Sequence, residues 1–275
     1  MELSLDSRIR LNNGVEMPLL GIGVWQLPEG GVCRRSVLTA LEAGVRLIDT
    51  AKVYENEREV GEAVRASGVP RDEVFITTKV WDGDQGYATT LRAFEGSLKR
   101  LGLGHIDLYL VHWPLTGKRR DTWRAMEEIL AGGACRAIGV SNYTEPHLAD
   151  VLSSGSVAPA VNQFELSPFL QPRGLVARCR AAGVAVEGYS PLAKARRLDH
   201  PVVRRVAAES GMTAAQVLIR WALEKGFVTI PRSSDPLHVR ENCDVFRAPL
   251  GAEATRALDA LDEGFRTSWD PTTVA

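Results

Sequence analysis

Four side chains that together could deliver a proton follow one another along the chain: Asp49, Tyr54, Lys79 and His112. Asp49 lies near the end of the apolar run VRLIDT, Lys79 near the end of VFITTKVW, and His112 near the end of IDLYLVHWP. Such short apolar runs are typical of buried strands. If these are neighbouring parallel strands, their carboxyl ends meet at one rim, and Tyr54 lies in the loop just beyond Asp49.

An acid, a phenol, an amine and an imidazole at one rim form a coherent acid–base set. A free phenol has a pKa of about 10, too high for a ready proton source at neutral pH. A nearby Lys79 ammonium would lower the pKa of Tyr54, and Asp49 would hold that ammonium in place. His112 would orient a carbonyl oxygen by donating a hydrogen bond, and Tyr54 would protonate that oxygen as hydride arrives at the carbon. Each residue alone is more often a cap, a packing residue or a surface residue, so the inference rests on all four together.

The chain alternates apolar strand-like runs with helical patterns, many of which end on glycine. Runs rich in Val, Ile and Leu are typical of parallel strands buried on both faces. We predict eight such strands: GIGVW, VRLIDT, VFITTKV, IDLYLVHW, CRAIGVSN, PAVNQFEL, VAVEGYS and FVTIP. Eight strand–helix units in 275 residues favour an α/β fold of the (β/α)₈ TIM-barrel type over an open doubly wound sheet.

Three additions to the barrel are expected. Residues 8–17 form an N-terminal β-hairpin with Asn13-Gly14 at its turn, which would plug the N-terminal end of the barrel. Residues 200–211 and 253–264 form two extra helices. No linker, repeat or low-complexity segment interrupts the sequence, so residues 1–275 are expected to form one domain.

Composition narrows the possible partners and compartments. The net charge of −1 gives no reason to expect nucleic acid or a membrane surface as a partner. No apolar run has membrane-spanning length, and the polar N-terminus lacks the apolar core of a signal peptide, so we expect a cytoplasmic protein. The four cysteines, Cys33, Cys135, Cys179 and Cys243, have no metal or redox spacing and are expected to be small buried or semi-buried residues.

Eight motifs in order give the sequence a family resemblance along nearly its whole length. They are MPLLGIGVWQ, DTAKVYENEREVG, TTKVW, SLKRLGLGHIDLYLVHWP, AIGVSNY, VNQFELSP, GYSPLA and IPRSSDPLHVREN. The chain resembles the aldo-keto reductases, in particular the short bacterial type similar to 2,5-diketo-gluconate reductases. The resemblance implies an NAD(P)H-dependent carbonyl reductase whose catalytic residues are Asp49, Tyr54, Lys79 and His112. It also implies a monomer that acts on small-molecule carbonyl substrates.

No GxGxxG or GxxxxGK[ST] motif follows a strand, so a dinucleotide would be held without a Rossmann fingerprint. By resemblance, Ser141, Asn142 and Gln163 would bind the nicotinamide carboxamide, and Tyr189 would stack on its ring. The full set implied to bind the cofactor is Gly23, Val24, Trp25, Asp49, Ser141, Asn142, Gln163, Tyr189, Ser190, Leu192, Ala215, Ile230, Arg232, Ser233, Ser234, His238, Glu241 and Asn242.

The resemblance places the adenosine 2′-phosphate at Arg232-Ser233-Ser234, where Asp235-Pro236 opens a helix. His238 stands where NADPH-dependent relatives usually carry arginine, and histidine is mostly neutral at pH 7 and lacks a bidentate fork. Arg232 therefore favours NADPH, while His238 and Asp235 favour tolerance of NADH. A second departure, Ser167 in place of histidine, is expected to affect only packing. Lys194, Arg196 and Arg197 are hypothesised to contact the cofactor pyrophosphate, whereas residues 118–120 are expected to be solvated.

Trp25, Trp81 and Trp113 end predicted strands and would form an apolar funnel above Tyr54 and His112, so these five are the expected substrate residues. Two other functions stay open. A non-catalytic NADPH-binding barrel would need no tyrosine–lysine pair. A barrel lyase or metal-dependent hydrolase would need a ligand cluster, and no His/Asp/Glu group has ligand spacing.

Overall fold

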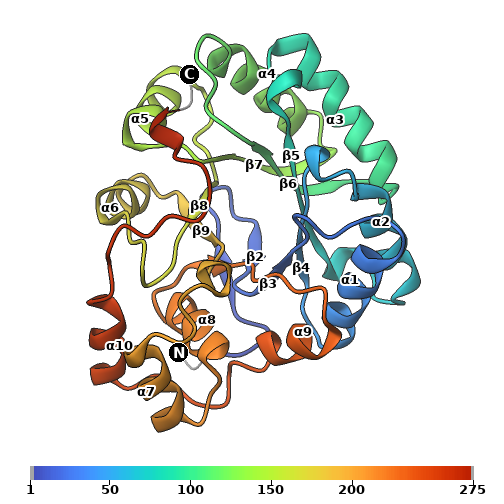
Figure 1. The fold of residues 1–275 in the computed structure, drawn as a ribbon. Helices are drawn as coiled ribbons and strands as arrows, with labels where there is room; N and C mark the ends of the chain where they lie inside the picture. The colour runs from blue at the N-terminus through green and yellow to red at the C-terminus, as the bar shows by residue number, and fades with distance from the viewer. Residues whose placement is uncertain (1–2, 274–275) are drawn as a thin grey trace.

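The computed structural model describes residues 3–273 and contains a sheet of eight parallel strands ringed by helices (Figure 1). The strands pair in chain order from β3 to β10, and each of them falls within one of the eight predicted runs. Their bounds are β3 Gly21–Gly23, β4 Leu47–Asp49, β5 Phe75–Val80, β6 Ile106–Val111, β7 Cys135–Ser141, β8 Val161–Glu165, β9 Ala185–Tyr189 and β10 Val228–Thr229.

Backbone hydrogen bonds between the first and last strand regions close this sheet into a barrel. Thr229 N donates to Leu19 O at 2.8 Å, and Gly23 N donates to Pro231 O at 3.1 Å. The prediction of a (β/α)₈ barrel is confirmed, and the open doubly wound alternative is wrong. The long strands β5 and β6 are buried throughout, because barrel side chains cover one face and helices cover the other.

Helices follow the strands around the outside of the barrel (Figure 1). The strand-following helices are α1 Val32–Glu42, α2 Glu57–Ala66, α3 Tyr87–Leu101, α4 Arg119–Ala131, α5 Glu145–Ser154, α6 Arg173–Ala181, α8 Ala214–Glu224 and α9 Pro236–Cys243. The two predicted extra helices are present as α7 Pro201–Ser210 and α10 Ala252–Asp259. Short 3₁₀ turns complete the loops: Lys52–Tyr54, Arg71–Glu73, Asp82–Asp84, Ala193–Ala195 and Pro271–Thr273.

The predicted hairpin is also present, as the antiparallel pair β1 Arg8–Arg10 and β2 Glu16–Pro18. Its turn is tied to the barrel, since the side-chain amides of Asn12 and Asn13 donate to the backbone oxygens of Pro159 and Arg136, each at 2.9 Å. Both acceptors lie where strands begin. The hairpin therefore covers the N-terminal end of the barrel and leaves the carboxyl ends of the strands open for a site.

Candidate active site

A cavity of about 350 Å³ opens at the carboxyl ends of the strands. It brings together side chains from all eight barrel strands or the loops that follow them, as the position of sites in such barrels leads one to expect. All five expected substrate residues line it, as do Asp49 and eight further residues of the expected cofactor set: Gly23, Ser141, Asn142, Gln163, Tyr189, Ser190, Leu192 and Ile230, with Arg232 at its edge.

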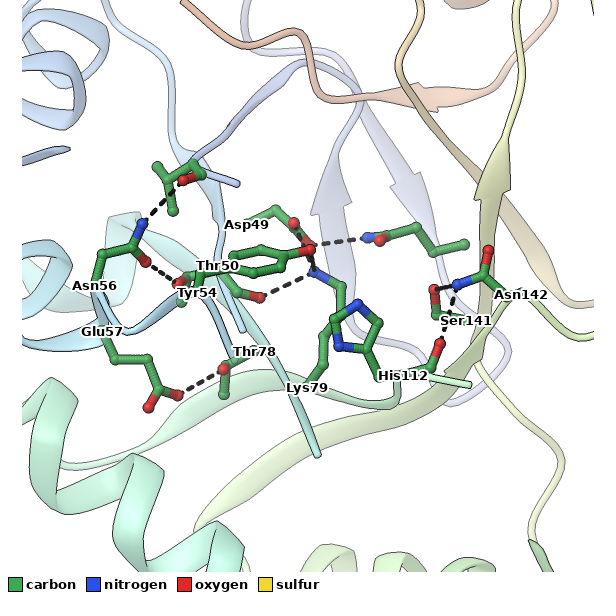
Figure 2. Close-up of polar contacts among 12 residues, drawn as sticks. Asp49, Thr50, Tyr54, Asn56, Glu57, Thr78, Lys79, His112, Ser141 and Asn142 are labelled. Atoms are coloured by element: carbon green, nitrogen blue, oxygen red, sulfur yellow. Dashed lines mark hydrogen bonds and ion pairs between the residues drawn. The ribbon is translucent and has the colours of Figure 1, made fainter. Parts of the chain in front are cut away.

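The Lys79 ammonium is the centre of the acid–base cluster (Figure 2). It donates to both carboxylate oxygens of Asp49, at 2.7 and 2.8 Å, and to the backbone oxygen of Thr50 at 2.9 Å. The Tyr54 hydroxyl lies 3.5 Å from the same nitrogen. Lys79 is fully buried and Asp49 nearly so, which makes this a desolvated ion pair with a phenol beside it.

The tertiary structure reverses one electrostatic expectation. We expected Lys79 to lower the pKa of Tyr54, but burial raises that pKa well above its ordinary value, and the Asp49 carboxylate raises it further. The expectation is wrong chiefly because burial disfavours the charged phenolate, and also because Asp49 neutralises the ammonium at close range, so that the phenol faces an ion pair rather than a lone cation. Tyr54 is therefore a firmly protonated phenol before any substrate is present.

His112 lies beside Tyr54, with ring centroids 5.7 Å apart in an edge-to-face arrangement. Burial lowers its pKa well below the ordinary value, and the Lys79 ammonium lowers it further, so the imidazole is neutral. A neutral imidazole still carries one N–H donor. His112 can therefore orient an acceptor oxygen in the cavity without adding a charge to it.

The loop that carries Tyr54 is fixed by a buried asparagine (Figure 2). Asn56 accepts a hydrogen bond from the Thr50 hydroxyl at 2.8 Å and donates to the backbone oxygens of Val24 and Leu27. These bonds join the loop after β4 to the loop after β3. The sequence places Tyr54 only near Asp49, whereas this bracing sets where its hydroxyl lies.

The amide groups expected to hold a carboxamide already form a network at the cavity wall. The Gln163 side chain donates to Asp49 at 2.8 Å. The Asn142 amide nitrogen donates to His112 O and Ser141 Oγ, each at 3.0 Å, and its oxygen accepts from the Tyr189 hydroxyl at 2.9 Å. Asn142 adopts φ 62°, a left-handed conformation that asparagine tolerates better than most residues. These groups, with the Tyr189 ring, suit a planar amide-bearing ring.

The remaining expected cofactor residues lie outside this cavity. Val24 is buried in the core, and Ala215 lies on α8. Glu241 accepts from the Thr213 hydroxyl at 2.6 Å, so it bridges α9 to the start of α8. The others are Ser233, Ser234, His238 and Asn242, which lie just before α9 or on it. Ser234 and His238 are exposed and Ser233 is half-buried, next to Arg232 in the chain, whereas Asn242, on α9, is buried.

The start of α9 carries its own negative charge. Asp235 is the N-cap, and its carboxylate accepts from Leu237 N at 2.9 Å. His238 lies 3.9 Å from the same carboxylate, and both side chains are largely exposed. The capping carboxylate occupies a position where a helix N-terminus would otherwise attract an anion.

The two basic clusters differ in their surroundings. Lys194 lines the cavity, lies 4.8 Å from the centre of the Trp25 ring, and donates to Thr267 O at 2.6 Å. Arg197 instead pairs with Glu263 at 2.8 Å and packs on Phe265. Residues 119 and 120 pair with Asp150. Of the three residues hypothesised to contact a pyrophosphate, only Lys194 faces the cavity.

Aromatic rings line the outer part of the cavity. Trp81 packs edge-to-face on His112, with centroids 5.4 Å apart, and Trp113 stacks 6.5 Å from it. A further indole, Trp269, lies 5.9 Å from Trp113 and is 66% exposed. Sequence reasoning missed Trp269, because this residue lies in a tail without periodicity. Ser167, by contrast, is buried away from the cavity and caps Phe169 N, in line with a packing role.

The tail that carries Trp269 is bound to the barrel mouth by one buried carboxylate. Glu165, at the end of β8, accepts from Thr267 N at 2.7 Å, from the Thr267 hydroxyl, and from Ser268 N at 2.9 Å. In Figure 1 this final segment runs from α10 past α6 towards α5. The tail thus forms part of the cavity wall rather than a free end.

A buried acid–base cluster at the carboxyl end of a closed (β/α)₈ barrel, under an aromatic mouth, defines a class of barrel enzymes. The chain belongs to the aldo/keto reductase family, whose model matches residues 19–263. Within residues 3–273, no helix is long and apolar enough to span a membrane, and no cluster of three or more His, Cys, Asp or Glu side chains could hold a metal ion.

The chain is 44% identical over 271 residues to glyoxal reductase of Bacillus subtilis, with 98% of each protein covered. Among solved structures, it resembles MGS-M4, an aldo-keto reductase from a Medee basin deep-sea metagenome library. The TM-score is 0.94 and the identity 38%, over 97% of this chain and 99% of that one. It also resembles a Gox0644 mutant in complex with NADPH, with a TM-score of 0.93 and 37% identity over 98% of both chains.

Proposed function

We propose that this protein reduces aldehydes or ketones to alcohols with NAD(P)H, and that Tyr54 supplies the proton. The observation that carries the proposal is the Lys79 ammonium, held between Asp49 and the Tyr54 hydroxyl at the floor of an aromatic-lined cavity. A reduced nicotinamide supplies hydride in such chemistry. The NADPH-bound structural relative and the amide-rich wall of Ser141, Asn142 and Gln163 both support a nicotinamide cofactor.

This chain's residues then have distinct roles. His112 donates its N–H to the carbonyl oxygen and orients it. Tyr54 gives its proton to the same oxygen as negative charge develops there. Lys79 stabilises the resulting phenolate, and Asp49 keeps the ammonium within 3.5 Å of the phenol oxygen. Because the ground-state pKa of Tyr54 is high, its proton leaves only when the developing alkoxide is a stronger base than the phenolate.

We infer that the substrates are small carbonyl compounds with apolar or aromatic bodies, since Trp25, Trp81 and Trp113 line the mouth with Trp269. The glyoxal reductase relative makes small dicarbonyls the first compounds to test. We further infer a preference for NADPH through Arg232, with tolerance of NADH, because His238 and Asp235 offer a 2′-phosphate little positive charge.

The deciding experiment compares wild type with Tyr54→Phe. Oxidation of NADPH is followed by absorbance with methylglyoxal, phenylglyoxal and 4-nitrobenzaldehyde. The variant should lose roughly 10²- to 10⁴-fold in kcat, the usual contribution of general acid catalysis. NADPH should still quench the tryptophan fluorescence of the variant as in wild type, because phenylalanine keeps the aromatic ring at position 54. Full turnover by Tyr54→Phe would refute the role of Tyr54. NADPH binding without turnover by wild type would favour a non-catalytic barrel.

A further inference from the structure

Below the acid–base cluster lies a second buried carboxyl that the proposed chemistry does not use. Glu187 is in the middle of β9, within the run Ala185–Tyr189, and has no exposed surface. Side chains two residues apart in a strand point to the same face. Tyr189 lines the cavity, so Glu187 points into the barrel interior one layer beneath it.

The strand register identifies the neighbours of Glu187. It stands opposite Gln163 on β8 and Val228 on β10. Gln163 in turn donates to Asp49 at 2.8 Å, so a single amide separates the Glu187 position from the Asp49–Lys79 pair. Neither carboxyl oxygen of Glu187 has a hydrogen-bond partner among the described residues.

The charges in this interior do not balance if every acid is ionised. One ammonium, Lys79, faces two carboxyl groups, and Lys79 is already bonded to both oxygens of Asp49. An ionised Glu187 would be a buried charge whose amide neighbour, Gln163, already donates to Asp49, and such a charge is costly in a water-excluded interior. A neutral carboxylic acid avoids that cost.

The titratable groups around Glu187 also favour its neutral, protonated state. Burial raises the pKa of Glu187 to about 8, and the Asp49 carboxylate also raises it, whereas Gln163 and Lys79 lower it to a smaller extent. The effect is mutual, since negative charge on Glu187 raises the pKa of the Tyr54 phenol further. A negative Glu187 thus opposes formation of the Tyr54 phenolate that proton delivery leaves behind.

We propose that Glu187 is a neutral carboxylic acid in the working protein, and that its neutrality lets Tyr54 give up a proton beside the Asp49–Lys79 pair. Glu187 is a positioning residue, because it acts through the charge balance around Lys79 rather than by contact with substrate. When it ionises, its proton passes to water and a second negative charge remains beneath the cluster. The catalytic half of this inference rests on the proposed reductase function, and the ionisation half does not.

The ionisation half predicts how stability depends on pH. The unfolded carboxyl ionises near its ordinary pKa of about 4.5, whereas the folded one keeps its proton until about pH 8. Between these values unfolding releases a proton, so Glu187 makes the wild type progressively less stable as pH rises. Below this window both states are protonated, and above it both are ionised, so the dependence on pH ends there.

The test compares wild type with Glu187→Gln by urea unfolding from pH 5 to pH 9. Gln has the same shape and cannot ionise. The unfolding equilibrium constant of wild type relative to the variant should grow by up to about tenfold per pH unit between pH 5 and pH 8. Glu187→Met is a second non-ionisable variant, and Glu253→Gln, on the exposed face of α10, controls for loss of a surface carboxyl. If the ratio of the two unfolding equilibrium constants, wild type to Glu187→Gln, stays the same from pH 5 to pH 9, the proposal is overturned.

The catalytic half is tested by measuring how kcat with phenylglyoxal changes as the pH rises above neutral. The ratio of kcat at pH 9 to kcat at pH 6.5 should be higher in Glu187→Gln than in wild type, on the order of tenfold, because no charge appears beneath the cluster. If this kcat ratio is the same in Glu187→Gln and in wild type, the link between Glu187 and Tyr54 is overturned. A wild type without turnover would refute the proposed reductase instead, while the unfolding comparison still decides the state of Glu187.

Discussion

At the scale of single residues, the ion pair between Lys79 and Asp49 is the most constrained feature of the site. Both partners are buried, and the ammonium also bonds Thr50 O. A buried charge that loses its partner destabilises a protein far more than the loss of the whole pair. The pair therefore holds the Tyr54 loop in place and also prepares the phenol for chemistry.

Lys79→Met should lower the free energy of unfolding by about 3–5 kcal/mol, because it leaves the Asp49 carboxylate buried and unpaired. The double variant Asp49→Asn/Lys79→Met should recover much of that loss, since no buried charge is left. Urea unfolding at neutral pH measures both. Equal stability of the single and double variants would show that the carboxylate finds another partner or becomes neutral.

His238 is the residue at which cofactor preference can be tested. His238→Arg places a permanent cation next to the Arg232 edge of the cavity and partly offsets the Asp235 charge. The ratio of kcat/KM for NADPH to that for NADH should rise a few-fold, as about 1 kcal/mol is usual for an exposed charge pair. His238→Gln is the matched control, because it adds no charge and should leave the ratio unchanged. A ratio that stays constant in the arginine variant would leave Arg232 as the sole determinant.

At the scale of elements, the position of the final segment of the chain depends on hydrogen bonds to the end of β8. One buried carboxylate, Glu165, accepts the amide groups of Thr267 and Ser268, and Trp269 follows directly. Lys194, from the loop after β9, binds Thr267 O from the other side. The strand ends thus hold the tail across the mouth, and the position of the Trp269 indole depends on these bonds.

Glu165→Gln should loosen the tail, because a neutral amide offers one acceptor oxygen in place of a carboxylate. Each charged hydrogen bond of this kind contributes roughly 1.5–3 kcal/mol. Hydrogen exchange at the amides of Thr267 and Ser268 should accelerate, and KM for aromatic aldehydes should rise as the Trp269 wall moves. Thr267→Val removes only the hydroxyl contact and should have a smaller effect. Unaltered exchange at these two amides would contradict the tether.

At the scale of the whole molecule, the thiols are distributed through a fold that needs no covalent cross-link. All four cysteines are free, and three of them are buried. Burial raises the pKa of Cys33, Cys135 and Cys243 to about 12 and that of Cys179 to about 11. Raised pKa values keep these groups as unreactive thiols at neutral pH.

A thiol reagent should therefore react slowly with the native protein at pH 8 and should titrate four thiols in guanidinium chloride without added reductant. A reducing agent should leave the urea midpoint unchanged. Fewer than four thiols in denaturant would reveal a disulfide, and rapid reaction of the native protein would reveal a thiol more exposed than the fold allows.

The sequence alone determined the barrel and the membership of its acid–base cluster. Each strand is a short apolar run bounded by loop residues, so its existence depends on local pattern. Asp49, Lys79 and His112 lie at or just beyond the ends of consecutive strands, and consecutive parallel strands are neighbours in a closed barrel. The hairpin and both extra helices carried equally local signals, in the Asn13-Gly14 turn and the helical periodicity.

Only the tertiary structure decided the charge states of the buried groups and the outer wall of the cavity. The sequence places Lys79 near Tyr54 but shows neither how deeply the phenol is buried nor that Asp49 neutralises the ammonium at 2.7 Å, so the pKa of the phenol was predicted in the wrong direction. In the sequence Glu187 is a single acid in an apolar strand, and only the strand register shows that it lies beside Gln163. Trp269 joins the cavity through the distant Glu165. Electrostatic energies and cavity walls depend on distances between segments far apart in the chain, and local periodicity carries no information about those distances.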